Sequence, residues 1–553
     1  MSSWAGQPSV KGSSEVMRMM LLTFSSVGMT FTWGIEMTYC TQYLLSLGLT
    51  KGQTSVVWIA GPLSGLIVQP IIGVISDQSK SKWGRRRPII MAATLVVVFS
   101  LICLGFTKEI VTFFIADRET AKVPTIALAV LALYATDFAI NAVMSCSRSL
   151  IVDTLPAHKQ QSGAAWASRM SSVGHITGYG MGAIDLVSLF GPTLGDTQFK
   201  QLTAIAALGM LISSSITCYA VSERILISSK SDSRYSSSNK GGGGGMGYLK
   251  IFRQISSTLL TLPPRIQAIC WAVFWGWIGW YPFLIYSSTW VGETYYRYDV
   301  PDDVKASSDA LGDMGRIGSL ALTVYSLVTF LSAWILPLLI KSPDDDQGET
   351  FTARPPKSIA PWIEKFNKLK PDLLTAWFCS HLLYSAAMFL APFAASFRSA
   401  TALVAVCGLP WSIAMWAPTT FMGIEVNKLG GEPANGSYRR LSVGASSIEL
   451  QDRTARHSSS DQPPGNTGEL SGVYFGILNI YTTLPQFIGT FMSTVIFAVL
   501  EPGKSPELAA DAHPSEQADT DGPNAIAVCL FIGALSTLGA AYATRKLMYV
   551  PYS

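Results

Sequence analysis

The chain has 553 residues, of which 49% are hydrophobic and only 14% are charged, with a formal net charge of +4. Soluble domains carry about 25% charged residues, so this composition lacks the polar surface that a soluble protein needs. Apolar runs of 18 or more residues recur along the chain, and each is long enough to cross a bilayer as a helix. The composition therefore excludes a soluble domain and predicts an all-α membrane protein.

Twelve such runs are predicted as transmembrane helices. The first follows a short polar N-terminus, contains Glu36 and lacks a small-residue cleavage site, so it is interpreted as a retained span rather than a signal peptide. The runs lie near 17–47, 54–76, 87–107, 124–148, 163–190, 202–222, 267–290, 315–340, 373–396, 399–424, 472–499 and 524–548.

The distribution of basic residues predicts the orientation. With the N-terminus in the cytoplasm, the inner segments contain most of the 40 lysine and arginine residues, as the positive-inside rule requires. Both termini are then cytoplasmic, and the net charge needs no nucleic-acid partner. No retention signal is evident, so the plasma membrane is the default location.

The longest connection between spans, 223–266, contains a serine-rich stretch followed by five glycines. Such a composition behaves as a flexible linker. It predicts an N-terminal six-helix bundle over 1–222 and a C-terminal one over 267–553, with cytoplasmic loops near 341–372 and 426–470. Two facing repeats of this kind are typical of carriers that rock around a site near the membrane midplane. A channel and a membrane-bound enzyme remain alternatives at this point.

The polar loops and the cysteines carry weaker signals. The sequence RRLS ends at Ser442 and fits a basophilic-kinase site, although a chance match in a solvated loop is the alternative. Asn435 begins a glycosylation acceptor in a loop assigned to the cytoplasm, so we expect it to be unmodified. The eight cysteines show no metal spacing, which predicts neither a disulfide nor zinc, and no cofactor is expected.

The stretch GVISDQSKSKWGRRRP follows the second span, with Asp77, Gly84 and three arginines, Arg85, Arg86 and Arg87. It resembles the loop between helices 2 and 3 of the major facilitator superfamily. Asp77 can pair with the arginines and hold two cytoplasmic helix ends together in one state of a transport cycle. The alternative is a positive-inside cluster with an incidental acid.

The resemblance extends over both halves of the chain. Residues 56–90, 137–153, 280–293 and 476–486 resemble, in order, stretches of the sucrose-transporter branch of the glycoside–pentoside–hexuronide:cation symporter family. The loops are unmatched. Membership would imply the major facilitator fold, with twelve helices in two bundles, and proton-coupled sugar transport.

One stretch departs from the plant members of that family. They carry acidic residues where this chain has Ser287 and Thr289, and a basic–acidic pair where it has Glu293 and Thr294. The outer charge cluster of those relatives is therefore expected to be missing here, so its role in gating cannot be carried over.

Residues 137–153, DFAINAVMSCSRSLIVD, place charges in an otherwise apolar span. On an α-helix Asp137, Asn141, Met144 and Arg148 share one stripe. Asp137 and Arg148 are roughly 16 Å apart along the axis, too far for a salt bridge. A charge at mid-bilayer costs at least ~2.5 kcal/mol, so such groups normally face a water-filled cavity and are functional candidates.

We therefore expect Asp137 to accept the proton and to contact sugar hydroxyls. Arg148 is expected to bind the sugar or to stabilise the deprotonated acid, and Asn141 lies between them. The family resemblance implies the same for this acid and this arginine, in proton coupling and in sugar binding. A buried structural network is the alternative.

Further candidates are weaker. Glu36 is expected to face the cavity or Arg148, with proton coupling and a structural role equally favoured. Asp153 points away from the stripe and is interpreted as a residue of the helix end or gate, with a structural role preferred. His175 and Asp185, in the fifth span, are weaker still.

Neutral groups can complete a sugar site because amides both donate and accept hydrogen bonds. Gln69, Asn479 and Gln486 are the candidates, and Trp58 offers an aromatic ring. The aromatic residues of the seventh span are interpreted mainly as packing or interfacial residues.

Together these features predict a proton-coupled importer of sucrose, maltose or another α-glucoside. The alternatives are a passive or organellar carrier of the same fold and a sugar sensor that does not transport. An enzyme is not expected, because the sequence has no nucleotide loop, nucleophile elbow or metal cluster. The expected partners are a sugar, a proton, the lipid bilayer and a cytoplasmic kinase.

Overall fold

The computed structural model describes residues 3–155, 159–228, 262–300, 310–341, 370–429, 467–506, 508, 513, 516–518 and 522–550. Most of the predicted linker and of the two long loops, with Asn435 and Ser442, lies outside the described residues. The described chain is almost entirely helical.

The helices of the first part of the chain begin with a long, interrupted one. Its segments follow one another closely where the first span is predicted: α1 (Glu15–Thr23), α2 (Ser25–Ile35), the π-helical segment η1 (Glu36–Cys40) and α3 (Thr41–Ser46). The elements that follow are α4 (Lys51–Val57), α5 (Ala60–Gln78), α6 (Arg87–Gly105), α7 (Thr107–Phe114), α8 (Arg118–Thr154), α9 (Gln160–Ala183), α10 (Leu186–Phe190), the 3₁₀ turn η3 (Gly191–Leu194) and α11 (Gln198–Ala220).

The second part contains eight further helical elements. They are α14 (Pro264–Tyr298), α15 (Ala310–Leu339), α17 (Leu373–Phe389), the 3₁₀ turn η5 (Ala391–Phe393), α18 (Phe397–Val406), α19 (Gly408–Leu429), α20 (Thr467–Leu500) and α21 (Ala525–Leu547).

Within the described residues, ten helices are long and apolar enough to cross a membrane, and they coincide with ten of the twelve predicted runs. The other two runs are also helical. The run 17–47 is divided into shorter segments, and α9 is rich in small and polar residues. Gly174 and Gly178 of α9 lie directly against the backbone of α2. Small residues allow helices to pack this closely. The composition of α9 therefore favours packing against α2, and it lowers the mean hydropathy of the helix.

Four short strands were not predicted. Strand β1 (Ser3–Ala5) pairs antiparallel with β4 (Ile225–Ser228), and β2 (Ser9–Val10) pairs with β3 (Val221–Ser222). The polar N-terminal segment is thereby hydrogen-bonded to the residues that follow α11.

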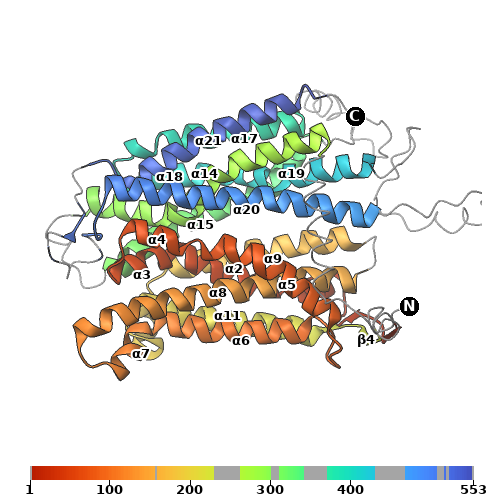
Figure 1. The fold of residues 1–553 in the computed structure, drawn as a ribbon, viewed down its shortest axis with the longest axis horizontal. Helices are drawn as coiled ribbons and strands as arrows, with labels where there is room; N and C mark the ends of the chain where they lie inside the picture. Colours follow the sequence, from red (N-terminus) through yellow and green to blue (C-terminus); the bar gives the residue numbers. More distant parts are fainter. Residues whose placement is uncertain are drawn as a thin grey trace, which may run out of the picture.

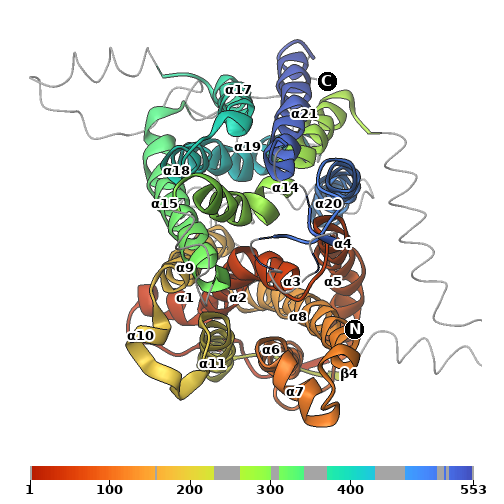
Figure 2. The same ribbon diagram turned by 90° about the vertical axis from the view of Figure 1, so that its left-hand side faces the viewer.

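The helices form two groups that lie side by side (Figure 1). We call the helices α1–α11 the first half and α14–α21 the second half. The larger buried apolar cluster contains residues of both halves, and a smaller one lies within the second half. Both termini lie at one end, on the right of Figure 1, which we call the Arg85 end. Helices α3, α4, α7 and α18 lie at the opposite end, the Lys51 end, which faces the viewer in Figure 2.

Candidate functional site

Two buried carboxyl groups lie together in the first half. Asp137 on α8 is 2% exposed, and Glu36, the first residue of η1, is 0% exposed. They are close enough for their charges to interact, and the Trp33 indole is within hydrogen-bonding reach of Asp137. Neither oxygen of Glu36, nor Oδ2 of Asp137, has a hydrogen-bond partner among the described residues. Unpaired polar atoms are costly to bury, so this pair is a candidate for chemistry rather than for stability.

This arrangement differs from the sequence-based expectation for both acids. Glu36 lies near Asp137 instead of facing a cavity or Arg148. Both carboxyl groups are closed off from solvent in this conformation. Glu36 also begins a π-helical turn, which the sequence did not predict. Single π turns are frequent at functional sites.

Asn141, one turn beyond Asp137, is fully engaged in hydrogen bonds. Its Nδ2 atom donates to Ser64 Oγ at 2.8 Å and to the Asp137 carbonyl at 3.0 Å. Its Oδ1 atom accepts from Gln69 Nε2 at 2.9 Å. Two predicted sugar ligands are therefore bonded to each other, and they join α5 to α8 beside the carboxyl pair.

The predicted stripe on α8 runs from a buried end to an exposed one. Asp137 and Asn141 are buried, Met144 is half-buried and Arg148 is exposed. Among the described residues, no carboxylate forms an ion pair with Arg148 within 4.0 Å. The N–H donors of Arg148 are thus not taken up by a carboxylate of the described residues.

The other predicted sugar ligands differ in burial and in their hydrogen-bond partners. Trp58 is 2% exposed, its Nε1 donates to Thr41 Oγ1 at 3.0 Å, and its carbonyl accepts from Tyr281 OH at 2.5 Å. Asn479 is exposed on α20, and Gln486 donates to the carbonyl of Thr482 at 3.1 Å. Trp58 therefore joins the two halves in this conformation.

The arginine motif forms a compact ionic network at the Arg85 end. Arg85 Nη2 lies 2.5 Å from Asp153 Oδ1, and Arg86 Nε lies 3.0 Å from Asp153 Oδ2. Asp153 thereby ties the end of α8 to the start of α6. Asp77 lies in the last turn of α5, and its side chain is outside the described residues.

Glu223 is a member of this network that sequence reasoning missed. Its carboxylate accepts hydrogen bonds from the backbone N–H groups of Arg85, Arg86 and Arg87 at 3.0, 2.9 and 2.8 Å. Gly84, with φ of +103°, brings this turn against Glu223. Glu223 was assigned to the flexible linker because it follows α11, and nothing in the sequence links it to residues more than 130 positions away.

A second charged network lies at the Lys51 end, and it differs from the outer charge cluster of the plant relatives, which is expected to be missing here. Lys51 Nζ lies 2.7 Å from Glu293 Oε1 and also bonds Glu501. Arg297 Nη2 lies 3.1 Å from Glu501 Oε1. Ser287 and Thr289 are neutral, and the structure buries both. Glu293 belongs to a different cluster, in which Lys51 and Glu501 lie far from it in the chain.

Burial opposes ionisation of Glu501, yet Lys51 and Arg297 hold the pKa of its carboxyl below the ordinary value. Glu501 lies just after α20, beyond the last apolar turn. It is therefore a charged partner at neutral pH. Sequence reasoning missed three members of this network, Lys51, Arg297 and Glu501. Each resembles an ordinary charged residue at the end of a span.

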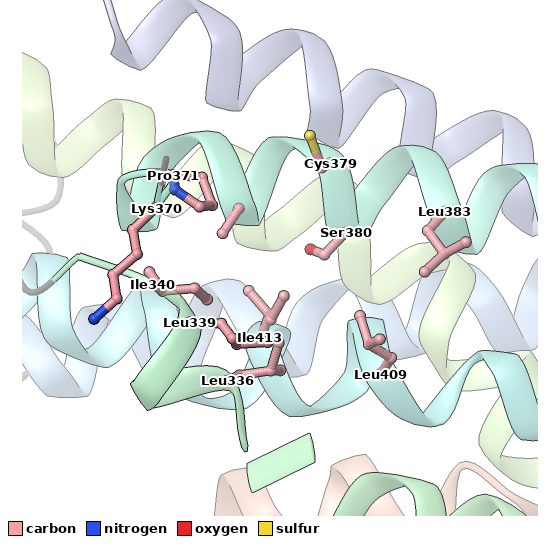
Figure 3. A pocket seen from close by; sticks show the side chains of 11 residues that line it. Leu336, Leu339, Ile340, Lys370, Pro371, Cys379, Ser380, Leu383, Leu409 and Ile413 are labelled. Carbon is pink, nitrogen blue, oxygen red and sulfur yellow. The ribbon is translucent and has the colours of Figure 1, made fainter. Parts of the chain in front are cut away.

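A cavity of about 400 Å³ lies between α15, α17 and α19 (Figure 3). Its walls are mainly leucine and isoleucine side chains, with Lys370 at one end and Ser380 in the wall. So few polar groups do not suit a molecule covered in hydroxyls. The cavity is not a candidate sugar site.

Comparison with known proteins gives the class. No family model matches the chain. It is similar to nucleoside transporter NupG (TM-score 0.55, 10% identity, 96% of this chain and 99% of that one). It is also similar to a D-xylose-proton symporter (TM-score 0.53, 11% identity, 96% and 98%). These likenesses establish the fold alone, which this chain shares with those two transporters.

Sequence relatives are more specific. The chain is 29% identical to the general alpha-glucoside permease of Schizosaccharomyces pombe over 588 residues, which cover 98% of this chain and 95% of that protein. It is 29% identical to sucrose transport protein SUC4 of Arabidopsis thaliana over 328 residues, or 57% of this chain and 62% of that protein. The match thus spans less than two thirds of the plant protein. The chain is thus similar to an alpha-glucoside permease over almost its whole length and to a sucrose transport protein over part of it, the kinds of relative that its motifs predict.

Proposed function

We propose that this protein is a proton-coupled symporter that imports sucrose, maltose or a related α-glucoside by alternating access. The observation that carries the proposal is the Asp137 carboxyl group, 2% exposed on a membrane-spanning helix, beside Glu36 and with Oδ2 lacking a hydrogen-bond partner among the described residues. The substrate class follows from the permease to which the chain is similar over 98% of its length.

Asp137 is the proposed proton acceptor, with Glu36 as its neighbour. Two negative charges buried together repel each other, and among the described residues neither carboxyl group forms an ion pair. A proton bound by the pair relieves that repulsion and lets the site close with little charge inside the membrane. When the site opens to the other side, water stabilises the released carboxylate.

Arg148 is the proposed sugar ligand. Its planar fork carries five N–H donors and matches the hydroxyl oxygens of a sugar. In this conformation Arg148 is an exposed residue, while Asp137 and Glu36 are closed off. We place the sugar along the α8 stripe, with Asn141 and Gln69 fixing the position of α8 against α5.

The proposed topology has twelve spans in two six-helix bundles, 1–222 and 267–553, joined by the cytoplasmic linker 223–266. Both termini are cytoplasmic, and the plasma membrane is the proposed location. The Arg85 end then faces the cytoplasm and the Lys51 end faces the outside. The exposure of Arg148, toward the Arg85 end of α8, supports a conformation that is open to the cytoplasm.

The test is the external pH of weakly buffered cells that express the protein, followed as sucrose or maltose is added. Sugar-coupled proton entry is expected to make the medium transiently alkaline, and vector-only cells and Asp137→Asn cells are the controls. An unchanged pH, with the protein detected at the surface, would contradict proton coupling. Sugar uptake measured in the same cells then separates a passive carrier from a sensor that binds without transport.

A further inference from the structure

The buried ion cluster at the Lys51 end joins the two halves of the molecule. Lys51, at the start of α4, is its member from the first half. Glu293 and Arg297 lie on α14 and Glu501 follows α20, all in the second half. Lys51 Nζ donates to Glu293 Oε2 at 2.8 Å and also to Glu501. The exposed fractions of the side chains are 5% for Lys51, 0% for Glu293 and 3% for Glu501, so water reaches little of the cluster.

Among the described residues, the charges that the second half contributes to this cluster do not balance on their own. Two carboxylates, Glu293 and Glu501, face one guanidinium, Arg297, at 3.9 and 3.1 Å. Neutral groups add to the site, since Asn524 Nδ2 donates to Glu293 at 2.8 Å and the Ala525 N–H to Glu501 at 3.0 Å. Lys51 supplies the positive charge that makes the cluster neutral, and it does so from the opposite half.

The Arg85 end is organised differently. The ion pairs of the described residues there lie within one half, as for Arg86 with Asp153 in the first and Arg265 with Glu425 at 2.9 Å in the second. At the Lys51 end further hydrogen bonds cross between the halves. Tyr281 OH donates to the Trp58 carbonyl at 2.5 Å, and Ser55 Oγ to the Thr490 carbonyl at 3.0 Å.

We propose that Lys51 is a gate residue: its ion pairs with Glu293 and Glu501 hold the two halves together at this end, and the transport path opens there only when they separate. The inference rests on alternating access, and it adds a functional residue that neither the proton nor the sugar site contains. Opening carries Lys51 away with the first half and leaves Glu293, Glu501 and Arg297 to be hydrated.

The predicted effect of a substitution follows from the burial of these charges. Removing one partner of a buried ion pair leaves an uncompensated charge in a dry site. In Lys51→Met that charge is the net −1 of the second half, and opening this end relieves it by admitting water. The variant should therefore favour the conformation that is open at the Lys51 end, rather than only weaken the fold.

The experiment measures the separation of the halves by double electron–electron resonance, with no sugar and no proton gradient. Spin labels are placed at Phe113→Cys, near the end of α7, and Phe393→Cys, in η5, in a background with Cys379→Ser. These two phenylalanines are 84% and 78% exposed and belong to different halves at the Lys51 end. In Lys51→Met the population at longer distances should rise about tenfold or more relative to the parent.

Three further variants make the result decisive. Lys51→Met with Glu293→Gln leaves Glu501 balanced by Arg297, so the distances should return toward those of the parent. Glu501→Gln leaves the cluster with a net positive charge and should also open this end, which provides a second test if Lys51→Met does not fold. Asp185→Asn removes another ion pair between the halves, Asp185 with Arg316 at 2.8 Å, but both partners are partly exposed, so it should change little.

Parent-like distances in folded Lys51→Met and in Glu501→Gln would overturn the proposal. An opening that Glu293→Gln fails to reverse would also overturn it, because the effect would then come from lost packing and not from charge. The distances are measured without sugar and without a proton gradient, so they do not depend on proton coupling. A transport assay that contradicts proton coupling would therefore leave the gate proposal standing, and the reverse also holds.

Discussion

Gln69 and Asn141 form a side-chain pair between α5 and α8, with Gln69 Nε2 donating to Asn141 Oδ1 at 2.9 Å. The pair lies one helical turn from Asp137. Asn141 is buried and also donates a hydrogen bond to Ser64 Oγ. The two amides thus fix the position of the helix that carries both the proposed proton acceptor and the proposed sugar ligand.

A double-mutant cycle tests this pair. Asn141→Leu leaves the Gln69 amide without its acceptor and should lower the free energy of unfolding by about 1–3 kcal/mol. Gln69→Leu should also destabilise, but the double variant should cost less than the sum, because neither amide is then left alone. Thermal unfolding of the purified protein measures all three. Strict additivity would show that the two side chains do not depend on each other.

Asp137→Asn should abolish uphill accumulation of sugar, because an amide cannot carry the proton. Radiolabelled sugar uptake in energised cells should then fall to equilibration across the membrane, while sugar exchange persists. Glu36→Gln is the companion variant, and we expect partial loss of accumulation, since it removes the neighbour and leaves the acceptor. Undiminished accumulation in Asp137→Asn would rule out its proposed role.

Arg148→Lys should reduce sugar transport strongly even though the charge is retained. An ammonium cannot reproduce the planar fork of donors, so kcat/KM for transport should fall about tenfold or more. Arg398→Lys, at an exposed position on α18, is the matched control and should be close to wild type. Wild-type kinetics in Arg148→Lys would show that the guanidinium does not contact the sugar.

Gly84→Ala should destabilise the arginine turn. Gly84 has φ of +103°, and an added Cβ atom would lie 2.7 Å from Glu223 Oε1. The expected cost is about 1–3 kcal/mol. Gly73→Ala lies in the same motif, has open space around its Cβ position and should be neutral or slightly stabilising. The melting temperatures of the two purified variants compare them, and equal values would show that the turn tolerates a side chain.

The helical part of the fold could be predicted largely from the sequence. Ten of the predicted runs coincide with helices suited to crossing a membrane, because a bilayer demands long apolar stretches that are visible residue by residue. The strand pairs of the N-terminal segment could not be predicted, since they depend on residues more than 200 positions away.

The candidate site was only partly predictable. Helical periodicity placed Asp137, Asn141 and Arg148 on one stripe, and the structure shows them graded from buried to exposed. It could not show that Glu36 lies beside Asp137, because the two residues belong to separate elements, η1 and α8, and periodicity within one helix says nothing of contacts between helices. Nor could it show that Gln69 and Asn141 satisfy each other.

The sequence by itself determined the class of molecule, the helices that are long and apolar enough to cross a membrane, and the motifs by which the chain resembles sugar transporters. Those properties follow from local composition and from motifs written in consecutive residues. The tertiary structure alone decided which charges meet: Glu223 with the backbone of the arginine motif, and Lys51 with Glu293 and Glu501 across the two halves. Such pairings depend on the distance between side chains after folding, and a charge in a sequence carries no sign of its partner.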